Sequence, residues 1–325
     1  MSVTLDHLLE PLSHWLDNPA VEEVCIQKPG ECWVYAAGEF ARHRVQLDSD
    51  EIEDIAIVAA AQRQQDVGRK RPLLATDLVG RGRLQAVLYP CVAEGLPSLT
   101  IRRGAAAWPT LEQLAAGDLF KTTRPRKNTA DDDELLLLYR AGAWQQFIGE
   151  AVRRRKTMII CGTNASGKTH LSKAALGEVP LHERLITIED APELRGLPHP
   201  NSVSLYYDKD ADNGAVTASE LVEAALRMRI GRLFLQEIRD GAAAIAFLVA
   251  LQTGHQGGIT TIHASDCNAV FDRLRVLIKQ TPGGAAVSDA DITSQLRSLI
   301  DVIIHAARDG NTFMVDEIWF KGCGP

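Results

Sequence analysis

The apolar positions of the first 60 residues change from a helical spacing to a β spacing and back again. Leucine and tryptophan recur every three or four residues between positions 5 and 16, which predicts a helix that packs on a core rather than on a membrane surface. Short apolar runs at residues 24–26 and 32–35 flank the turn signal Lys28-Pro29-Gly30 and predict a hairpin. Residues 51–64 have one apolar face and predict a second helix.

Two more strands are expected at residues 83–88 and 98–101, before the composition changes. Between residues 121 and 134 a basic cluster precedes an acidic run, with almost nothing apolar, which indicates a solvated linker. We therefore expect an α+β N-terminal domain over residues 1–120, a linker over residues 121–134 and a second domain over residues 135–325.

Helical and strand patterns alternate from residue 134 onward. The expected strands are residues 157–161, 185–188 and 233–235, and the expected helices are residues 134–152, a segment that ends at 176, 219–229 and 242–251. This alternation is typical of βαβ units on a mainly parallel sheet. The predicted fold class is therefore α/β, preceded by the smaller α+β domain.

Composition and charge narrow the class of protein. The chain has 325 residues, of which 46% are hydrophobic and 24% charged, which excludes a disordered, collagen-like or disulfide-stapled chain. A net charge of −7 argues against a uniformly basic nucleic-acid binder. The charge is unevenly spread, because residues 1–60 hold 12 acidic and 3 basic side chains whereas residues 61–110 hold 3 acidic and 8 basic ones.

Cysteine spacing and hydropathy indicate the compartment. The six cysteines form no C-x-x-C pair, so the sequence has no sign of a zinc or redox motif. The first residues lack the basic and apolar regions of a signal peptide. The longest apolar run, of about ten residues, is too short for a membrane span of roughly 20. We expect a cytosolic, reduced and soluble protein.

The clearest motif lies between an expected strand and an expected helix. Residues 162–169 fit the phosphate-binding pattern G-x-x-x-x-G-K-[ST], in which backbone N–H groups surround the phosphates at a helix N-terminus. Lys168 is expected to reach the β/γ-phosphates and the Thr169 hydroxyl to bind Mg²⁺; the alternative is a glycine-rich structural turn. The predicted nucleotide-binding residues are Gly162, Thr163, Asn164, Ala165, Ser166, Gly167, Lys168, Thr169 and His170.

Acidic residues end two of the expected strands. Glu189 and Asp190 follow one strand and Glu237 follows another, and ligands bind at the carboxyl ends of parallel strands. Such acids hold Mg²⁺ through water or polarise the attacking water in P-loop enzymes. The alternatives are a helix cap at the first pair and a surface carboxylate at Glu237.

Residues 254–264 place glycines, threonines and two histidines around a further strand. Thr260 and His263 could sense a γ-phosphate by hydrogen bonding, whereas isolated histidines are more often structural. The segment carries no metal-ligand spacing.

The order of motifs in this chain resembles that of the VirB-type traffic ATPases of type IV secretion systems. The motifs are the P-loop, R-x-I-T-I-E-D-x-x-E-L at residues 184–194, L-R-M-R at residues 226–229, the strand that ends at Glu237 and the glycine–histidine segment. Pilus-retraction and type II secretion ATPases are related to that family. The resemblance covers most of residues 134–325 and continues more faintly upstream. It implies a RecA-like ATPase domain, ATP and Mg²⁺ as ligands, and a hexameric ring with nucleotide between the two domains of each subunit.

The resemblance also implies roles for single residues. Arg83 and Arg102 match N-domain arginines that reach nucleotide phosphates, for which the alternative is a surface salt bridge worth ~0–1 kcal/mol. His255 and His263 frame the family's His box, and Arg227 and Arg229 are lesser candidates for subunit contacts. The implied catalytic residues are Glu237, Lys168, Glu189, His263, Arg83 and Arg102, and the implied Mg²⁺ ligands, directly or through water, are Thr169, Asp190 and Glu237.

Three features depart from the family. Asn164 and Ala165 stand where the loop usually has threonine and glycine, and a Cβ at the second position restricts positive φ. Gln236 replaces the usual glycine before Glu237, which predicts slower turnover if it crowds the attacking water. The absence of paired C-x-x-C motifs argues against most type II secretion ATPases, and the C-terminal signature of pilus-retraction motors is not apparent.

The predicted function is Mg²⁺-dependent ATP hydrolysis that powers substrate translocation or pilus biogenesis at a type IV secretion channel. The resemblance implies a cytoplasmic homohexamer, peripheral to the inner membrane and in contact with other secretion components. The alternatives are a type IV pilus or type II secretion motor, a nucleic-acid translocase, and a scaffold that binds ATP without hydrolysing it.

Overall fold

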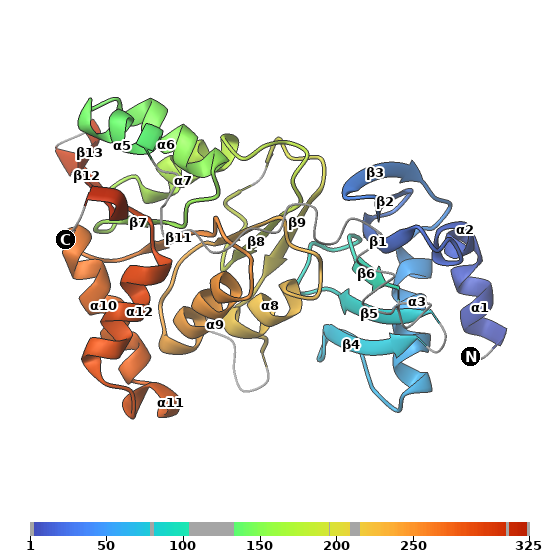
Figure 1. The fold of residues 1–325 in the computed structure, drawn as a ribbon. Helices are drawn as coiled ribbons and strands as arrows, with labels where there is room; N and C mark the ends of the chain where they lie inside the picture. Colours follow the sequence, from blue (N-terminus) through green and yellow to red (C-terminus); the bar gives the residue numbers. More distant parts are fainter. Residues whose placement is uncertain are drawn as a thin grey trace, which may run out of the picture.

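Two β-sheets of different construction organise the chain (Figure 1). The structure is a computed structural model, and it describes residues 3–78, 81–103, 133–194, 196–208, 215–309 and 312–323. The N-terminal sheet is drawn in blue and cyan, and the C-terminal sheet lies beside it, with the remaining helices around it. No helix in these ranges is long and apolar enough to cross a bilayer.

The N-terminal sheet is antiparallel throughout, with the strand order β3-β2-β1-β6-β5-β4. The predicted hairpin is confirmed as β1 and β2, which pair across residues 28–31. Its strands are β1 (Val21–Lys28), β2 (Glu31–Ala36), β3 (Glu39–Arg44), β4 (Leu73–Leu78), β5 (Gly82–Val87) and β6 (Ser98–Arg102).

Helices α1 (Val3–Leu9), α2 (Ser13–Leu16) and α3 (Ser49–Gln62) bury their apolar stripes against this sheet. The helix expected over residues 5–16 is interrupted by the 3-10 turn η1 (Glu10–Leu12). Pro11 is the physical reason, because proline has no N–H for a helical hydrogen bond and fits only the first turn of a helix.

The C-terminal sheet has the order β13-β12-β7-β11-β10-β8-β9, in which every pair is parallel except β12–β13. The predicted α/β class with a mainly parallel sheet is confirmed. The strands are β7 (Met158–Cys161), β8 (Leu185–Glu189), β9 (Ser202–Tyr206), β10 (Arg232–Leu235), β11 (Ile259–Ile262), β12 (Val302–Asp309) and β13 (Thr312–Phe320).

Helices cover both faces of this sheet. Alternation along the strands sends neighbouring side chains into separate cores, so that Ile159 packs on one face and Ile160 on the other. On one face lie α5 (Asp133–Arg140), α6 (Trp144–Arg153) and α7 (Lys168–Gly177). On the other lie α8 (Ala218–Ala225), α9 (Gly241–Gln252), α10 (Cys267–Lys279) and α12 (Asp289–Leu299) (Figure 1). The short α11 (Pro282–Ala285) packs at the end of α10, and the 3-10 turn η2 (Lys321–Cys323) follows β13.

Two expected helices have different limits. The single helix expected over residues 134–152 is two helices, because Gly142 takes a left-handed conformation (φ +67°) between α5 and α6. The helix expected over residues 219–229 ends at Ala225, and Arg229 beyond it has a positive φ of 50°. Residues 121–132 of the expected linker lie outside the described residues, so the domain limits stay predictions.

A buried polar cluster joins the two sheets. The Arg184 guanidinium, 1% exposed, donates to Gln27 Oε1 and to Asn201 Oδ1, both at 2.7 Å. Gln27 Nε2 donates to the same Asn201 oxygen at 2.9 Å. Gln27 belongs to β1 of the first sheet, whereas the other two residues flank β8 and β9 of the second. The two sheets are therefore held together by hydrogen bonds shielded from water.

Candidate active site

The phosphate-binding loop lies between β7 and α7, where two glycines allow close packing. Gly162 and Gly167 have φ values of +149° and +94°. A Cβ on Gly162 would lie 2.2 Å from the carbonyl oxygen of Ala306 in β12, and a Cβ on Gly167 would lie 2.8 Å from the Phe313 ring in β13. Ala165 adopts φ +58° despite its Cβ, so the loop keeps the left-handed turn where the family has glycine.

Lys168 folds back over this loop. Its Nζ donates to the carbonyl oxygens of Gly162 (3.0 Å) and Thr163 (2.7 Å), and it lies 3.3 Å from His263 Nδ1. Burial lowers the pKa of the Lys168 ammonium, and the Glu237 carboxylate opposes that shift. The lysine charge is therefore held at the mouth of the loop by backbone oxygens that a phosphate can replace.

A line of side chains leads from Lys168 to the acidic residues. His263 Nδ1 lies 3.3 Å from Lys168 Nζ and 3.2 Å from the Gly162 carbonyl oxygen, and its Nε2 lies 3.2 Å from Glu237 Oε1. Arg239 contacts Glu237 Oε2 at 3.0 Å and Asp190 Oδ2 at 2.8 Å. These residues follow β7, β11, β10 and β8, whose carboxyl ends meet at one edge of the sheet.

Gln236 makes hydrogen bonds that connect the ends of the strands that carry these residues. Gln236 Oε1 accepts from the backbone N–H of Asp190 at 2.8 Å, and its carbonyl oxygen accepts from Thr261 Oγ1 at 2.7 Å. The Gln236 side chain therefore ties the end of β10 to the end of β8. Thr260 is fully buried, and its hydroxyl donates to the Thr261 carbonyl oxygen at 3.4 Å. In that segment, the residue that reaches Lys168 is His263.

Glu189 is placed differently from Glu237. It is 1% exposed, and its two carboxylate oxygens accept from Thr187 Oγ1 (2.7 Å) and from the backbone N–H of Leu194 (3.0 Å). Burial raises the pKa of this carboxyl group, against the effect of these hydrogen bonds. Its contacts organise the segment after β8, and the described contacts do not include the P-loop.

Arg83 and Arg102 lie opposite each other on β5 and β6, and they line a cavity between the two sheets. This cavity has a volume of about 680 Å³, and residues 162–170 are not among the described residues that line it. Its charged and titratable lining residues are Glu23, Asp77, Arg83, Arg102, Arg227, Arg229 and His255. Within one chain, the structure therefore separates the two arginines and His255 from the predicted loop.

Glu23 contacts two of the arginines that line that cavity. It lies 3.2 Å from Arg229 and 3.6 Å from Arg102, and burial nevertheless raises the pKa of its carboxyl group. Arg229 also lies over the ring of Tyr35, with 3.4 Å between its Cζ and the ring centroid. The lesser candidate Arg229 thus makes contacts between the two sheets of the same chain.

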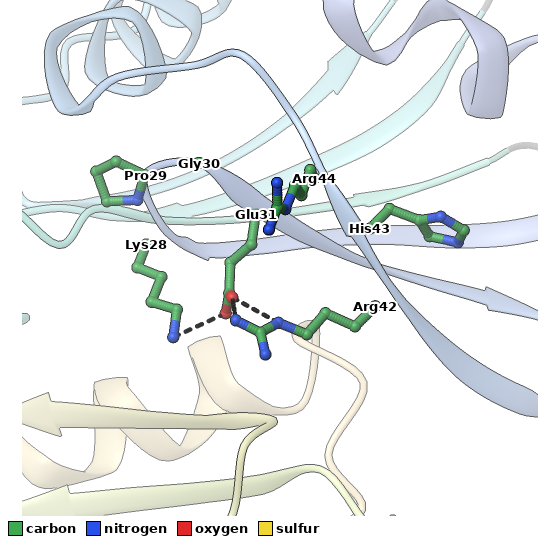
Figure 2. A pocket seen from close by; sticks show the side chains of 7 residues that line it. All are labelled: Lys28, Pro29, Gly30, Glu31, Arg42, His43 and Arg44. Carbon is green, nitrogen blue, oxygen red and sulfur yellow. Dashed lines mark hydrogen bonds and ion pairs between the residues drawn. The ribbon is translucent and has the colours of Figure 1, made fainter.

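Another cavity, of about 520 Å³, lies at the β1–β2 turn and is lined by no predicted site residue. Figure 2 shows Lys28 and Arg42 directed at the Glu31 carboxylate. Lys28 Nζ lies 3.0 Å from Glu31 Oε1, and Arg42 Nε donates to Oε2 at 2.7 Å. These contacts balance the charge of Glu31 within the hairpin, which indicates a structural ion pair.

The remaining predicted residues lie around α7. Thr169 is half-buried in its first turn, and His170 is exposed and stacks on Phe313 of β13. Phe313 and Arg239 are not among the site residues predicted from the sequence. Arg239 stands two residues after Glu237, a signal that was available, whereas Phe313 is far from every motif in the sequence. No group of three or more His, Cys, Asp or Glu side chains able to hold a metal occurs in the described part of the chain.

Comparisons with known proteins extend over nearly the whole chain. Residues 133–309 match the family model described as Type II/IV secretion system protein. The protein VirB11 of Rhizobium radiobacter is 42% identical over 322 residues, covering 97% of this chain and 93% of that protein. The type IV secretion system protein VirB11 of Brucella suis is 36% identical over 321 residues, covering 96% and 89%. The crystal structure of the Brucella suis VirB11 ATPase in complex with sulphate superposes with a TM-score of 0.93 at 35% identity, covering 98% of this chain and 95% of that one.

Proposed function

Since this chain belongs to the VirB11 family of type IV secretion ATPases, we propose that its P-loop binds ATP with Mg²⁺ and that hydrolysis powers substrate translocation or pilus biogenesis. The observation that carries this proposal is the line of contacts from Lys168 through His263 to Glu237. It joins the lysine that would bind a phosphate to the acid that would act on water.

The loop fits a triphosphate on three counts. The two glycines bring its backbone close to β12 and β13, where any larger residue would clash. The Ser166 hydroxyl is buried in the loop and has no hydrogen-bond partner among the described residues, although buried hydroxyls normally have one. Backbone N–H groups at the start of α7 favour an anion, and the Brucella suis relative was solved with sulphate, a tetrahedral anion like a phosphate group.

We further propose that Thr169, Asp190 and Glu237 hold Mg²⁺, directly or through water. The ion would neutralise charge on the phosphate oxygens. Hydroxyl and carboxylate oxygens suit it, and two of the three residues already lie side by side on Arg239.

In this mechanism Glu237 orients the attacking water and draws a proton from it, while His263 holds the carboxylate through Oε1. Lys168 leaves the Gly162 and Thr163 carbonyl oxygens and donates to the β/γ-phosphates. Arg83 and Arg102 would stabilise charge on the transferred phosphoryl group. Since they line the cavity between the two sheets and not the P-loop, that role needs domain movement or a neighbouring subunit.

The proposed assembly is a homohexamer that works with other type IV secretion components on the cytoplasmic side of the inner membrane. The net charge of −7 supports a protein rather than a nucleic-acid partner. The mass of the assembly with and without ATP tests the oligomer, and a monomer in both conditions would contradict it.

Replacement of Lys168 by alanine tests the ATPase site. We expect a fall in steady-state ATP hydrolysis of about 100-fold or more, because a preorganised cation opposite the developing charge is lost. Lys173→Ala is the matched control, since Lys173 is exposed on the same helix. Undiminished hydrolysis by the Lys168 variant would contradict the P-loop assignment.

A further inference from the structure

An aromatic pair lies directly beside the P-loop and has no part in the mechanism above. The rings of His170 in α7 and Phe313 in β13 stack with 5.6 Å between their centroids and 22° between their planes. Phe313 is 48% exposed and His170 is also exposed, although aromatic rings usually bury most of their surface. Part of this aromatic surface is therefore open to solvent at the end of the loop.

The Phe313 ring is fixed to the loop itself. A Cβ on Gly167 would lie 2.8 Å from the ring, so the phenyl group covers the glycine that begins α7. Arg308 on β12 lies over the same ring, with its Cζ 5.1 Å from the centroid. Contacts from α7, β12 and β13 thus hold the ring in a defined position, which limits the entropy lost when a ligand packs on it.

The order of the strands indicates which end of a bound nucleotide would reach this surface. In the sheet, β7 lies between β11 on one side and β12 on the other. His263 and Glu237 follow β11 and β10, so the terminal phosphate belongs on that side of Lys168. A nucleotide that crosses the loop from there extends toward β12 and β13, where Phe313 and His170 lie.

We propose that the Phe313–His170 pair is the binding surface for the purine base of the nucleotide. This inference rests on the proposed function, because it takes the phosphates to lie in the loop. A base that stacks on an aromatic side chain gains affinity without a hydrogen bond to that side chain. The pair therefore adds affinity for the base, while Lys168 and the loop bind the phosphates.

Equilibrium binding of two probes separates these contributions. ATP contains the base and inorganic tripolyphosphate does not, so both are titrated against the wild type, Phe313→Ala, Phe313→Tyr and Met314→Ala. We expect Phe313→Ala to raise the Kd for ATP by about 5- to 100-fold and to leave the Kd for tripolyphosphate unchanged. Phe313→Tyr keeps the ring and should restore ATP binding. Met314→Ala is the matched control, because Met314 is an equally exposed neighbour on β13.

Equal weakening of both probes by Phe313→Ala would overturn the proposal, since the ring would then only support the loop. Unchanged binding of both probes would also overturn it. Lys168→Ala is titrated in parallel and should weaken both probes. If it weakens neither, the proposed function fails; if it weakens both while Phe313→Ala changes nothing, only the base surface fails.

Discussion

Arg239 is the residue that links the two acidic strand ends, because one of its nitrogens lies within 3.0 Å of both Glu237 and Asp190. Without it both carboxylates would lose a shared cation, and Glu237 would lose the contact that fixes Oε2. We expect Arg239→Ala to lower kcat by about 10- to 100-fold, the range seen when a residue that orients a site ligand is removed.

Steady-state kinetics of Arg239→Ala, Arg239→Lys and the exposed control Arg273→Ala test this expectation. Lysine keeps one charge and should recover part of the activity. A normal kcat for Arg239→Ala would mean that Glu237 needs no such support.

Gln236 makes a structural contact where the family usually has glycine. Its Oε1 accepts from the backbone N–H of Asp190, so the side chain points toward the end of β8. Gln236→Gly should lower the free energy of unfolding by about 1 kcal/mol, because it removes that hydrogen bond and adds backbone freedom. Urea unfolding measures this loss of stability, and steady-state kinetics measure the effect on kcat. Faster hydrolysis by the glycine variant would instead mean that the side chain obstructs the attacking water.

At the scale of single residues, the sequence predicts those whose spacing is set by phosphate binding and by the activation of water. Residues 162–169 and Glu237 are recognisable because phosphate binding and water activation need those groups after a strand. The buried position of Glu189 was not predictable, since it depends on Thr187 and on the segment that follows β8. Phe313 is joined to the site only through the pairing of β12 with β13.

Among the elements, α3 shows how local signals fix a boundary. Asp48 accepts from the Glu51 N–H at 2.9 Å, and Glu51 Oε2 accepts from the Asp48 N–H at 2.8 Å, so the two side chains form a capping box. Asp48→Ala should lower the free energy of unfolding by about 1 kcal/mol. Asp50→Ala in the same first turn is the control and should cost less, because Asp50 caps no N–H in the described structure. Chemical denaturation monitored by circular dichroism compares the two, and equal losses would contradict the capping role.

Strands and helices with strong periodicity were predictable, and their limits were less so. The strands β7, β8 and β10 are short apolar runs bounded by charged or glycine residues, which no helix pattern matches. In contrast, β13 has six exposed residues at its start, so it lacks the alternation that marks a half-buried strand. The break at Gly142 depends on a backbone angle that apolar spacing does not encode.

At the scale of the whole molecule, a buried polar cluster adds to apolar contacts at the junction between the sheets, where Val87 of β5 and the following Cys91 and Val92 pack into the core of the second sheet. Arg184 is buried, and its hydrogen-bond partners within the described ranges are neutral oxygens, those of Gln27, Asn201 and the Met228 backbone. A buried charge of this kind is costly when one partner is lost, so the cluster favours a single arrangement of the two sheets. The basic stretch of residues 61–110 contributes Arg83 and Arg102 to the same junction. Part of its positive charge therefore lies between the sheets, and these two arginines would reach the P-loop of their own chain only after the domains rearrange.

His255 makes that junction sensitive to pH. It lines the cavity between the sheets, and burial, together with the charge of Arg155, lowers the pKa of its imidazole below 6.5, against a backbone hydrogen bond with Ile230. The unfolded chain therefore takes up a proton at a higher pH than the folded one, and stability is lost as the pH falls below about 6.5 toward the lower folded value.

His255→Asn removes this proton linkage, so the variant should lose less free energy of unfolding than the wild type between pH 7 and pH 5.5. Urea unfolding at the two pH values measures the difference. His7→Asn is the control, because His7 is 82% exposed at the other end of the molecule and its replacement should leave the dependence on pH as in the wild type. A wild-type pH dependence in the His255 variant would place the titrating group elsewhere. A reduced pH dependence would mean that acid weakens the contact between the sheets through this imidazole. Arg83 and Arg102 lie at that contact, so it must open if they are to reach the nucleotide of their own chain.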